Sequence, residues 1–364
     1  MKLSRALVSE RNSQIDSLRA FSFFLVFFYH AGFIEAGYIG VDLFFILSGY
    51  LMTGSVTVIS QAEGSRGIFT FVKKRVSRLV PSILAVTFIT ILFAYLIVPD
   101  TDRSEILRSS LMTLVAGTNY YLALSQDYFG VGAMFNPFTH MWSISAEMHF
   151  YVIIAILGFG FSFSKFWFIA FVGLLVGSNL LYSGDSSQSY LFSHSRIFSF
   201  LAGYCLYFLT IRVRLQFKYL TIFKAILYVL ILLSSIVKFP LLFFGDADWL
   251  INSLAANILG FSLLFLILNS DNAGESKSSV IKESIVNTWN YLGRISYSLY
   301  LVHFPIISYT FWIWGELTLL SLIGVFIASV SLAALNYKFV EARYAEWESR
   351  SRIVDAETKV FKTY

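Results

Sequence analysis

The sequence is poor in cysteine and in charge. Cys205 is the one cysteine among 364 residues, which excludes a disulfide within the chain and a thiolate cluster for zinc or an iron–sulfur centre. Charged residues make up 13% of the chain, whereas soluble domains contain about 25%. This scarcity of charge excludes an ordinary soluble domain, so the fold has to be held by packing and internal hydrogen bonds.

Apolar residues are present in excess: 57% of the chain is hydrophobic, 18% is aromatic and the mean hydropathy is +0.70. A helix that crosses the hydrocarbon core needs about 20 predominantly apolar residues. These runs predict an all-α, polytopic integral membrane helix bundle. They lie at 15–32, 38–59, 79–98, 107–124, 140–160, 165–183, 195–211, 219–237, 248–268, 289–312 and 317–338.

Basic residues separate the runs. The positive-inside rule places such stretches in the cytoplasm, so the net charge of +5 requires no nucleic-acid partner. Five runs lie between the stretch that ends at Arg78 and the one that begins at Arg212, and an odd number of crossings cannot join two loops on one side. We expect 107–124 to be re-entrant or non-crossing, which leaves about ten crossings. The basic residues are Lys2, Arg5 and Arg11; Arg66, Lys73, Lys74, Arg75 and Arg78; Arg212, Arg214 and Lys218; Lys277 and Lys282; and Lys338, Arg343, Arg350 and Arg352.

The chain shows no repeat with a period of 20–50 residues and no polar stretch long enough to form a separate soluble domain. We predict one transmembrane domain over residues 1–345 and a cytoplasmic tail over 346–364. The first apolar run lacks a cleavage pattern, so we expect no removed signal peptide. Both termini are predicted to be cytoplasmic.

Ionisable residues inside apolar runs are costly and need a reason. The first run contains Asp16, Arg19 and His30. His30 is eleven residues after Arg19, which in a helix is three turns plus about 20°. Both side chains therefore point to the same face of the helix, and they lie about 16 Å apart along its axis. Asp16 shares that face. His30 either packs against a neighbouring helix or acts as a general base on an acceptor hydroxyl.

The second run buries Asp42 among aromatic residues, where a carboxylate has to be protonated or paired. His30 or an arginine is the expected partner. Asp42 therefore either orients His30 or joins two helices. Gly40 and Gly49 are expected to let helices approach closely.

A basic stretch leads into the third run and contains Lys74, Arg75 and Arg78. It can be a plain cytoplasmic anchor. However, Arg75 and Arg78 are one helical turn apart, which places two guanidinium groups on one face in a geometry suited to phosphate. A CoA-using enzyme would need such a pair on the cytoplasmic side.

The segment 136–152 carries a further polar cluster. In a helix, His140 and Glu147 would lie on one face, where the glutamate could hold the imidazole or a packing arginine, and His149 would point elsewhere. We predict a site role for Glu147 and a structural role for His149. Trp142 and Ser145 of this segment are candidate substrate contacts.

Later runs offer fewer candidates. Arg196 could bind an anionic donor or lipid, or extend to the interface. Tyr297 is a further candidate substrate contact. His303 precedes Pro305 and is interpreted chiefly as part of a helix kink, with substrate contact as the alternative.

Six segments occur in the order found in the acyltransferase family 3 membrane proteins, which the chain resembles over about residues 15 to 345. The resemblance implies a bacterial inner-membrane O-acyltransferase that moves acetyl or another small acyl group from acyl-CoA to a hydroxyl of a cell-surface polysaccharide, lipopolysaccharide or lipid-linked sugar. It implies no metal and no permanent cofactor. The segments are IDSLRAFSFFLVFFYHAG, GYIGVDLFFILSGYLMTG, KKRVSRLVP, HMWSISAEMHFY, SRIFSFLAGY and LGRISYSLYLVHFPII.

By motif, the resemblance implies that Arg19 and His30 are the essential pair, that Asp42 and Glu147 support the site, and that a basic group serves the acyl-CoA. This basic group comprises Arg75 and Arg78, with Lys74 beside them.

Two features depart from many relatives. Where they read WSLSVEEQFY this chain has WSISAEMHFY, so Met148 and His149 replace an acidic residue and a glutamine. No esterase-like domain follows the last run, so we expect a stand-alone form that delivers acyl groups itself. Membrane lipids are expected partners and a homodimer is allowed for. The rival readings are a transporter of a lipid-linked sugar or other solute, and a silent scaffold.

Overall fold

The computed structural model describes residues 12–64, 67–125, 131–160, 190–213, 220–237, 249–269, 280–344 and 346. The described residues contain no strand, which confirms the all-α prediction. The expected run 165–183, the tail from 347 and several basic stretches lie outside these ranges, and the proposed domain limits stay predictions.

The helices follow the predicted runs closely in most places. They are α2 (Ser13–His30), α3 (Ile39–Glu63), α4 (Gly67–Ile97), α5 (Asp100–Leu114), α6 (Thr118–Ser125), α7 (Trp142–Gly160), α10 (Ser193–Arg212), α11 (Leu220–Val237), α13 (Trp249–Leu268), α14 (Val280–Arg294), α15 (Ser296–Trp314) and α16 (Leu319–Asn336). Short 3-10 segments form η2 (Val131–Phe135) and η3 (Thr139–Met141), and a π-helical turn forms η4 (Tyr337–Glu341).

Three helical stretches in the described residues are long and apolar enough to cross a membrane unaided: 39–63, 67–97 and 319–344. Others, such as α2, are shorter or carry polar side chains on a buried face. The structure is therefore that of a helical membrane protein, and the total of about ten crossings stays a prediction.

Helix α4 begins at Gly67 and not near residue 79, as the run of apolar residues had predicted. Its 31 residues would extend about 46 Å at 1.5 Å per residue, whereas the hydrocarbon core is about 30 Å thick. The basic stretch is thus a helical extension of the apolar part. This extension fixes Arg75 and Arg78 on the same rigid element.

Two predicted runs are each divided between helices. The run 107–124 falls on α5 and α6, which part where Ala116 has a positive φ of 56°; it is not one crossing helix. The run 289–312 starts inside α14 and continues in α15 after a break at Ile295. Apolar character alone does not reveal such a break, because apolar residues occur on both sides of it.

Local signals fix both ends of α2, the helix that carries Arg19 and His30. The side chain of Asn12 accepts a hydrogen bond from the Gln14 backbone N–H, which caps the first turn. The helix ends at His30, and Gly32 then takes a φ of 79° that glycine adopts without strain. His30 is consequently the last residue of a well-defined helix.

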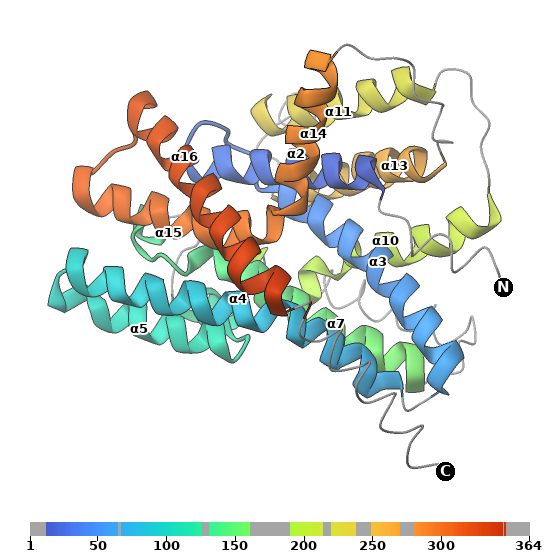
Figure 1. Ribbon diagram of the computed structural model, residues 1–364, viewed down its shortest axis with the longest axis horizontal. Coiled ribbons are helices and arrows are strands. Elements are labelled where there is room, and N and C mark those ends of the chain that lie inside the picture. The colour runs from blue at the N-terminus through green and yellow to red at the C-terminus, as the bar shows by residue number, and fades with distance from the viewer. Residues whose placement is uncertain are drawn as a thin grey trace.

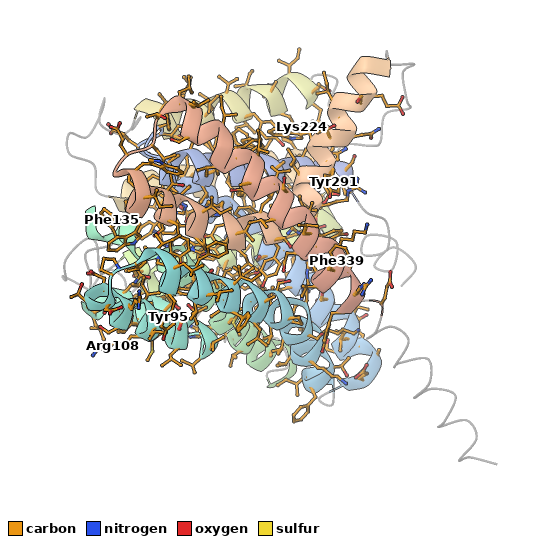
Figure 2. The ribbon with its side chains drawn as sticks, turned by 60° about the vertical axis from the view of Figure 1, so that its left-hand side comes forward. Tyr95, Arg108, Phe135, Lys224, Tyr291 and Phe339 are labelled. Carbon is orange, nitrogen blue, oxygen red and sulfur yellow. The ribbon has the colours of Figure 1, made fainter. Side chains whose placement is uncertain are left out.

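Helix α3 crosses the middle of the bundle, with α10 packed along it and α2, α4, α7 and α13 against its other sides (Figure 1). Figure 2 shows Tyr95 of α4 and Arg108 of α5 at the lower side of the bundle and Lys224 of α11 and Tyr291 of α14 at the upper side. Helix α2 belongs with the upper group, since it packs against α14. Helices α2, α3, α4, α7 and α15 together surround the site described below.

Two glycines permit the close packing of α3 and α10. A Cβ at Gly49 would lie 2.1 Å from the carbonyl oxygen of Phe200, and one at Gly203 would lie 2.0 Å from that of Ile46. Both obstacles are backbone atoms, which cannot move without separating the helices. Gly40 serves α2 and α3 in the same way, at 2.4 Å from the carbonyl oxygen of Ser22.

We predict that Gly203→Ala lowers the stability of the purified protein by about 1–3 kcal/mol through overpacking. Gly324→Ala is the matched control, because a Cβ at Gly324 meets nothing within 4 Å and alanine gains up to about 1 kcal/mol of helix propensity. Thermal loss of monodisperse protein in detergent measures both variants. Equal stability of the two would contradict the close α3–α10 contact.

Candidate active site

A cavity lies between α2, α3, α4, α7 and α15 and holds about 790 Å³ of space, part of it open to solvent. Arg78 at one end is exposed, Arg19, Arg75 and Glu147 are partly buried, and Ser143 and Tyr300 at the other end are buried. The cavity therefore runs from a polar mouth inward. Its lining consists of Arg19, Val41, Phe44, Phe45, Leu47, Ser48, Leu51, Met52, Arg75, Arg78, Leu79, Ser143, Ile144, Glu147, Tyr151, Ser296, Tyr297 and Tyr300.

Three arginines and one glutamate line this cavity, so its ionised side chains carry a net charge of +2. The Arg19 Nε donates a hydrogen bond to Ser296 Oγ at 3.0 Å, and Arg75 Nη2 donates to Ser55 Oγ at 2.5 Å. These bonds hold two guanidinium groups in place while leaving most of their donors for an anion. Phosphate and carboxylate groups are the anions that match such a set.

Glu147 forms the acidic point of the cavity wall. Its Oε1 accepts hydrogen bonds from Ser48 Oγ at 2.7 Å and from Tyr151 OH at 3.0 Å. Glu147 does not bond to His140, one of the two kinds of partner considered for it; His140 bonds to the Leu301 carbonyl oxygen instead. His140 lies in the 3-10 segment before α7, so the helical spacing that places it on the face of Glu147 does not apply.

Two hydroxyl groups close the inner end of the cavity. Ser143 Oγ and Tyr300 OH lie 2.6 Å apart, and Tyr300 OH also donates to the carbonyl oxygen of His140 at 3.1 Å. The ring of Tyr300 lies 5.4 Å from the ring of His303 and 5.6 Å from that of His140. The side chain of Tyr300 thus forms an end wall that separates the inner end of the cavity from a cluster of histidines.

The cluster consists of His30, His140 and His303, whose exposed fractions are 5%, 1% and 0%. His30 Nδ1 lies 2.9 Å from His303 Nε2, and the His140 ring lies 5.5 Å from that of His303. Phe304 packs against His30 and His140. Three of the chain's five histidines therefore share one apolar compartment.

Pro305 explains how His140 is held. Proline has no N–H, so the carbonyl oxygen of Leu301, four residues earlier in α15, lacks its usual helical donor. His140 Nε2 lies 3.2 Å from that oxygen and donates to it. The proline thereby creates the acceptor that positions this imidazole.

Arg19 and His30 both contact α15, the first at Ser296 and the second at His303. The prediction that they share one face of the helix is confirmed. Arg19 lines the cavity, whereas His30 is not part of the lining and contacts His303, whose ring lies 5.4 Å from that of Tyr300.

Asp42 pairs with Arg196 and not with His30. Its Oδ1 lies 3.3 Å from Arg196 Nη1 and accepts from Ser199 Oγ at 2.7 Å. Arg196 also donates to the Tyr190 carbonyl oxygen at 2.9 Å and to Ser253 Oγ at 2.8 Å. Both members of this ion pair are 1% exposed. The geometry favours a structural link between α3 and α10 over contact with substrate.

Of the other predicted substrate contacts, Tyr297 lines the cavity, whereas Trp142 and Ser145 do not. Tyr297 lines it and donates to the Leu79 carbonyl oxygen at 2.8 Å. Trp142 is fully buried against Tyr190 and beneath Arg196, and neither Trp142 nor the buried Ser145 is part of the cavity lining. Lys74 does not belong to the lining either.

His149 accepts or donates a hydrogen bond at 2.8 Å to Ser193, away from the cavity, in keeping with the structural role predicted for it. Within the described ranges, no group of three or more histidine, cysteine, aspartate or glutamate side chains is arranged to hold a metal ion. The histidine cluster is bonded internally and to backbone carbonyl groups.

Comparison with known families identifies the chain. A model of the acyltransferase domain family matches residues 12–337. The chain belongs to this family. O-acetyltransferase OatA of Staphylococcus aureus (strain NCTC 8325 / PS 47) is 27% identical over 344 residues, which are 90% of this chain and 56% of OatA. The chain therefore spans little more than half the length of that relative.

A second relative of this chain is BcsY of Komagataeibacter xylinus, named as a candidate membrane-bound transacylase. It is 25% identical over 354 residues, which are 94% of this chain and 85% of BcsY. No solved structure matches the chain. Family membership and the apolar helices agree that this chain is a membrane protein.

Sequence reasoning missed the place of His303 in the histidine cluster. The proline two residues later drew attention to a kink and away from the imidazole. A usable signal was present: His303 is seven residues after Ser296, hence two helical turns along one face, and Arg19 and His30 are spaced three turns apart on a helix that could lie beside it.

Proposed function

We propose that this protein is a membrane-bound O-acyltransferase that moves an acetyl or similarly small acyl group from acyl-CoA to a hydroxyl of a cell-surface glycan or lipid-linked sugar. The observation that carries the proposal is the path that leads from Arg78 and Arg75 at the cavity mouth, past Arg19, to the hydroxyl pair at the inner end, with the histidine cluster behind it. The names of OatA, an O-acetyltransferase, and BcsY, a candidate transacylase, support acyl transfer.

The donor enters the cavity with its phosphates at the mouth. Arg75 and Arg78 meet them first and Arg19 lies further in, so charge attracts the anionic end while the apolar side chains of α3 contact the rest. The basic stretch of α4 favours a cytoplasmic mouth in the inner membrane, with both termini on that side. This is the compartment that supplies acyl-CoA.

The reaction involves the acyl donor in the cavity and His30 behind the end wall. The acceptor oxygen attacks the thioester carbonyl carbon, its proton passes to His30 Nε2, the C–S bond breaks, and the sulfur leaves with that proton as CoA thiol. Alternatively the same nitrogen first takes the acyl group and then passes it to the hydroxyl. Both routes give one ester and one CoA thiol, and both need His30 Nε2 unprotonated at the start.

The test is transfer of radiolabelled acetyl from acetyl-CoA to the glycan fraction of membranes that carry the protein. Label that depends on the protein is the expected result. Membranes that show no protein-dependent label with acetyl-CoA or with a panel of short acyl-CoA donors would contradict the proposal.

We predict that Arg75→Gln raises the KM for acetyl-CoA about 10- to 100-fold, since a hydrogen bond to a charged group contributes about 1.5–3 kcal/mol. The maximal rate should change little, because Arg75 does not reach the reacting atoms. Initial rates over a range of acetyl-CoA concentrations measure the effect.

Lys74→Gln is the matched control for Arg75→Gln. It removes the same charge from the neighbouring position of α4, but Lys74 is not part of the cavity lining. An equal rise in KM for both variants would indicate general attraction by the basic stretch and would contradict a specific phosphate site.

A further inference from the structure

The two ring nitrogens of His303 have different partners. Its Nδ1 lies 2.8 Å from the carbonyl oxygen of Tyr300 and 3.2 Å from that of Leu299. A carbonyl oxygen only accepts hydrogen bonds, so the hydrogen has to be on Nδ1. The helical backbone of α15 therefore fixes the protonation site of this imidazole.

The surroundings of His303 favour its neutral form. Phe23 packs edge-on against its ring at 5.4 Å, and the other neighbours are His30, His140, Phe27, Tyr300 and Phe304. Throughout the described part of the chain no carboxylate forms an ion pair with any imidazole of the cluster. A positive charge buried there without a counter-ion would be costly. A neutral His303 with hydrogen on Nδ1 presents a lone pair at Nε2.

That lone pair determines the state of His30. Because His303 Nε2 can only accept, His30 Nδ1 at 2.9 Å has to donate. A neutral His30 with hydrogen on Nδ1 keeps its own lone pair on Nε2. No second hydrogen bond to His30 occurs among the described residues, so Nε2 is left available.

We propose that His303 is a positioning residue which fixes His30 as the Nδ1–H tautomer and so directs the Nε2 lone pair to the reacting groups. The proposal rests on the proposed acyl transfer for the use of that lone pair, whereas the tautomer itself follows from the hydrogen bonds. In many catalytic histidines a carboxylate accepts the hydrogen bond from the ring N–H; here His303 accepts it and in turn donates to a backbone carbonyl oxygen.

The first test is spectroscopic and requires no turnover. The protein is labelled with 15N-histidine, and the signals of His30 are assigned as those that disappear in His30→Ala. We expect His30 to show a protonated Nδ1 and an unprotonated Nε2. The opposite tautomer, or a doubly protonated His30, in the wild-type protein at neutral pH overturns the inference.

The second test compares two amides at position 303. In His303→Gln the side-chain oxygen can take the place of Nε2 and accept from His30. In His303→Asn the amide nitrogen can take the place of Nδ1 and donate to Tyr300, but the shorter side chain does not reach His30. We expect His303→Asn to lose acetyl transfer on the order of 100-fold and His303→Gln to stay within about 10-fold of wild type, both with unchanged KM for acetyl-CoA.

The outcomes separate this inference from the proposed function. Absence of acyl transfer with every donor removes the proposed function but leaves the spectroscopic result standing. Transfer combined with equal activity of His303→Asn and wild type overturns the positioning role alone. The spectroscopic test uses no substitution at position 303, so it tests the inference even where His303→Asn or His303→Gln fails to fold.

Discussion

Replacement of His30 by alanine is expected to lower acetyl transfer on the order of 1000-fold, because a positioned acid–base group contributes about 10²–10⁴ in rate. The loss should fall on the maximal rate and leave the KM for acetyl-CoA unchanged, since His30 lies behind the cavity wall and touches none of the arginines. Labelled acetyl transfer by membranes with equal amounts of each protein measures it.

His149→Ala is the control for the loss of a histidine. His149 is partly buried on α7 and bonds to Ser193, outside the cavity. It should retain transfer within a few-fold of wild type. Undiminished transfer by His30→Ala would show that the reaction does not use the cluster.

The second large effect concerns the buried ion pair between α3 and α10. Arg196→Gln leaves the carboxylate of Asp42 buried without its guanidinium, and breaking a buried pair in this way costs about 3–5 kcal/mol. We expect a strong drop in the thermal stability of the purified protein. The double variant Asp42→Asn, Arg196→Gln removes both charges and should recover most of that loss.

Activity per folded molecule then distinguishes a structural role from a catalytic one. The double variant should transfer acetyl at a rate within about fivefold of wild type. If Arg196→Gln instead folds normally and raises the KM for acetyl-CoA, Arg196 binds the donor and the structural assignment is wrong.

Spacing within one helix could be predicted well from the sequence. Helical geometry alone predicts that Arg19 and His30 share a face, and in the structure both contact α15. It also predicts that Arg75 and Arg78 share a face, and both line the cavity. The positions of most helices could also be predicted, because a long apolar run in a membrane has few alternatives to a helix.

Contacts between helices were much harder to predict. Asp42 requires a partner, but helical periodicity does not reveal that α10, more than 150 residues later, brings Arg196 to it. The His140–Glu147 pairing failed because a 3-10 segment interrupts the periodicity. The break at Ile295 lies where α14 and α15 pack against α2, and the contact of His303 with His30 is likewise one between helices, so the spacing within α15 alone does not reveal it.

A membrane that stores energy as an ion gradient loses it through any continuous file of water. The hydroxyl pair of Ser143 and Tyr300 ends the open cavity, and the histidines behind it are enclosed by phenylalanine rings and have almost no exposed surface. An ion that followed the arginines inward would have to cross this buried layer, where a charge without a counter-ion is costly. Under the proposed acyl transfer, the same layer would oppose a leak of ions through the site.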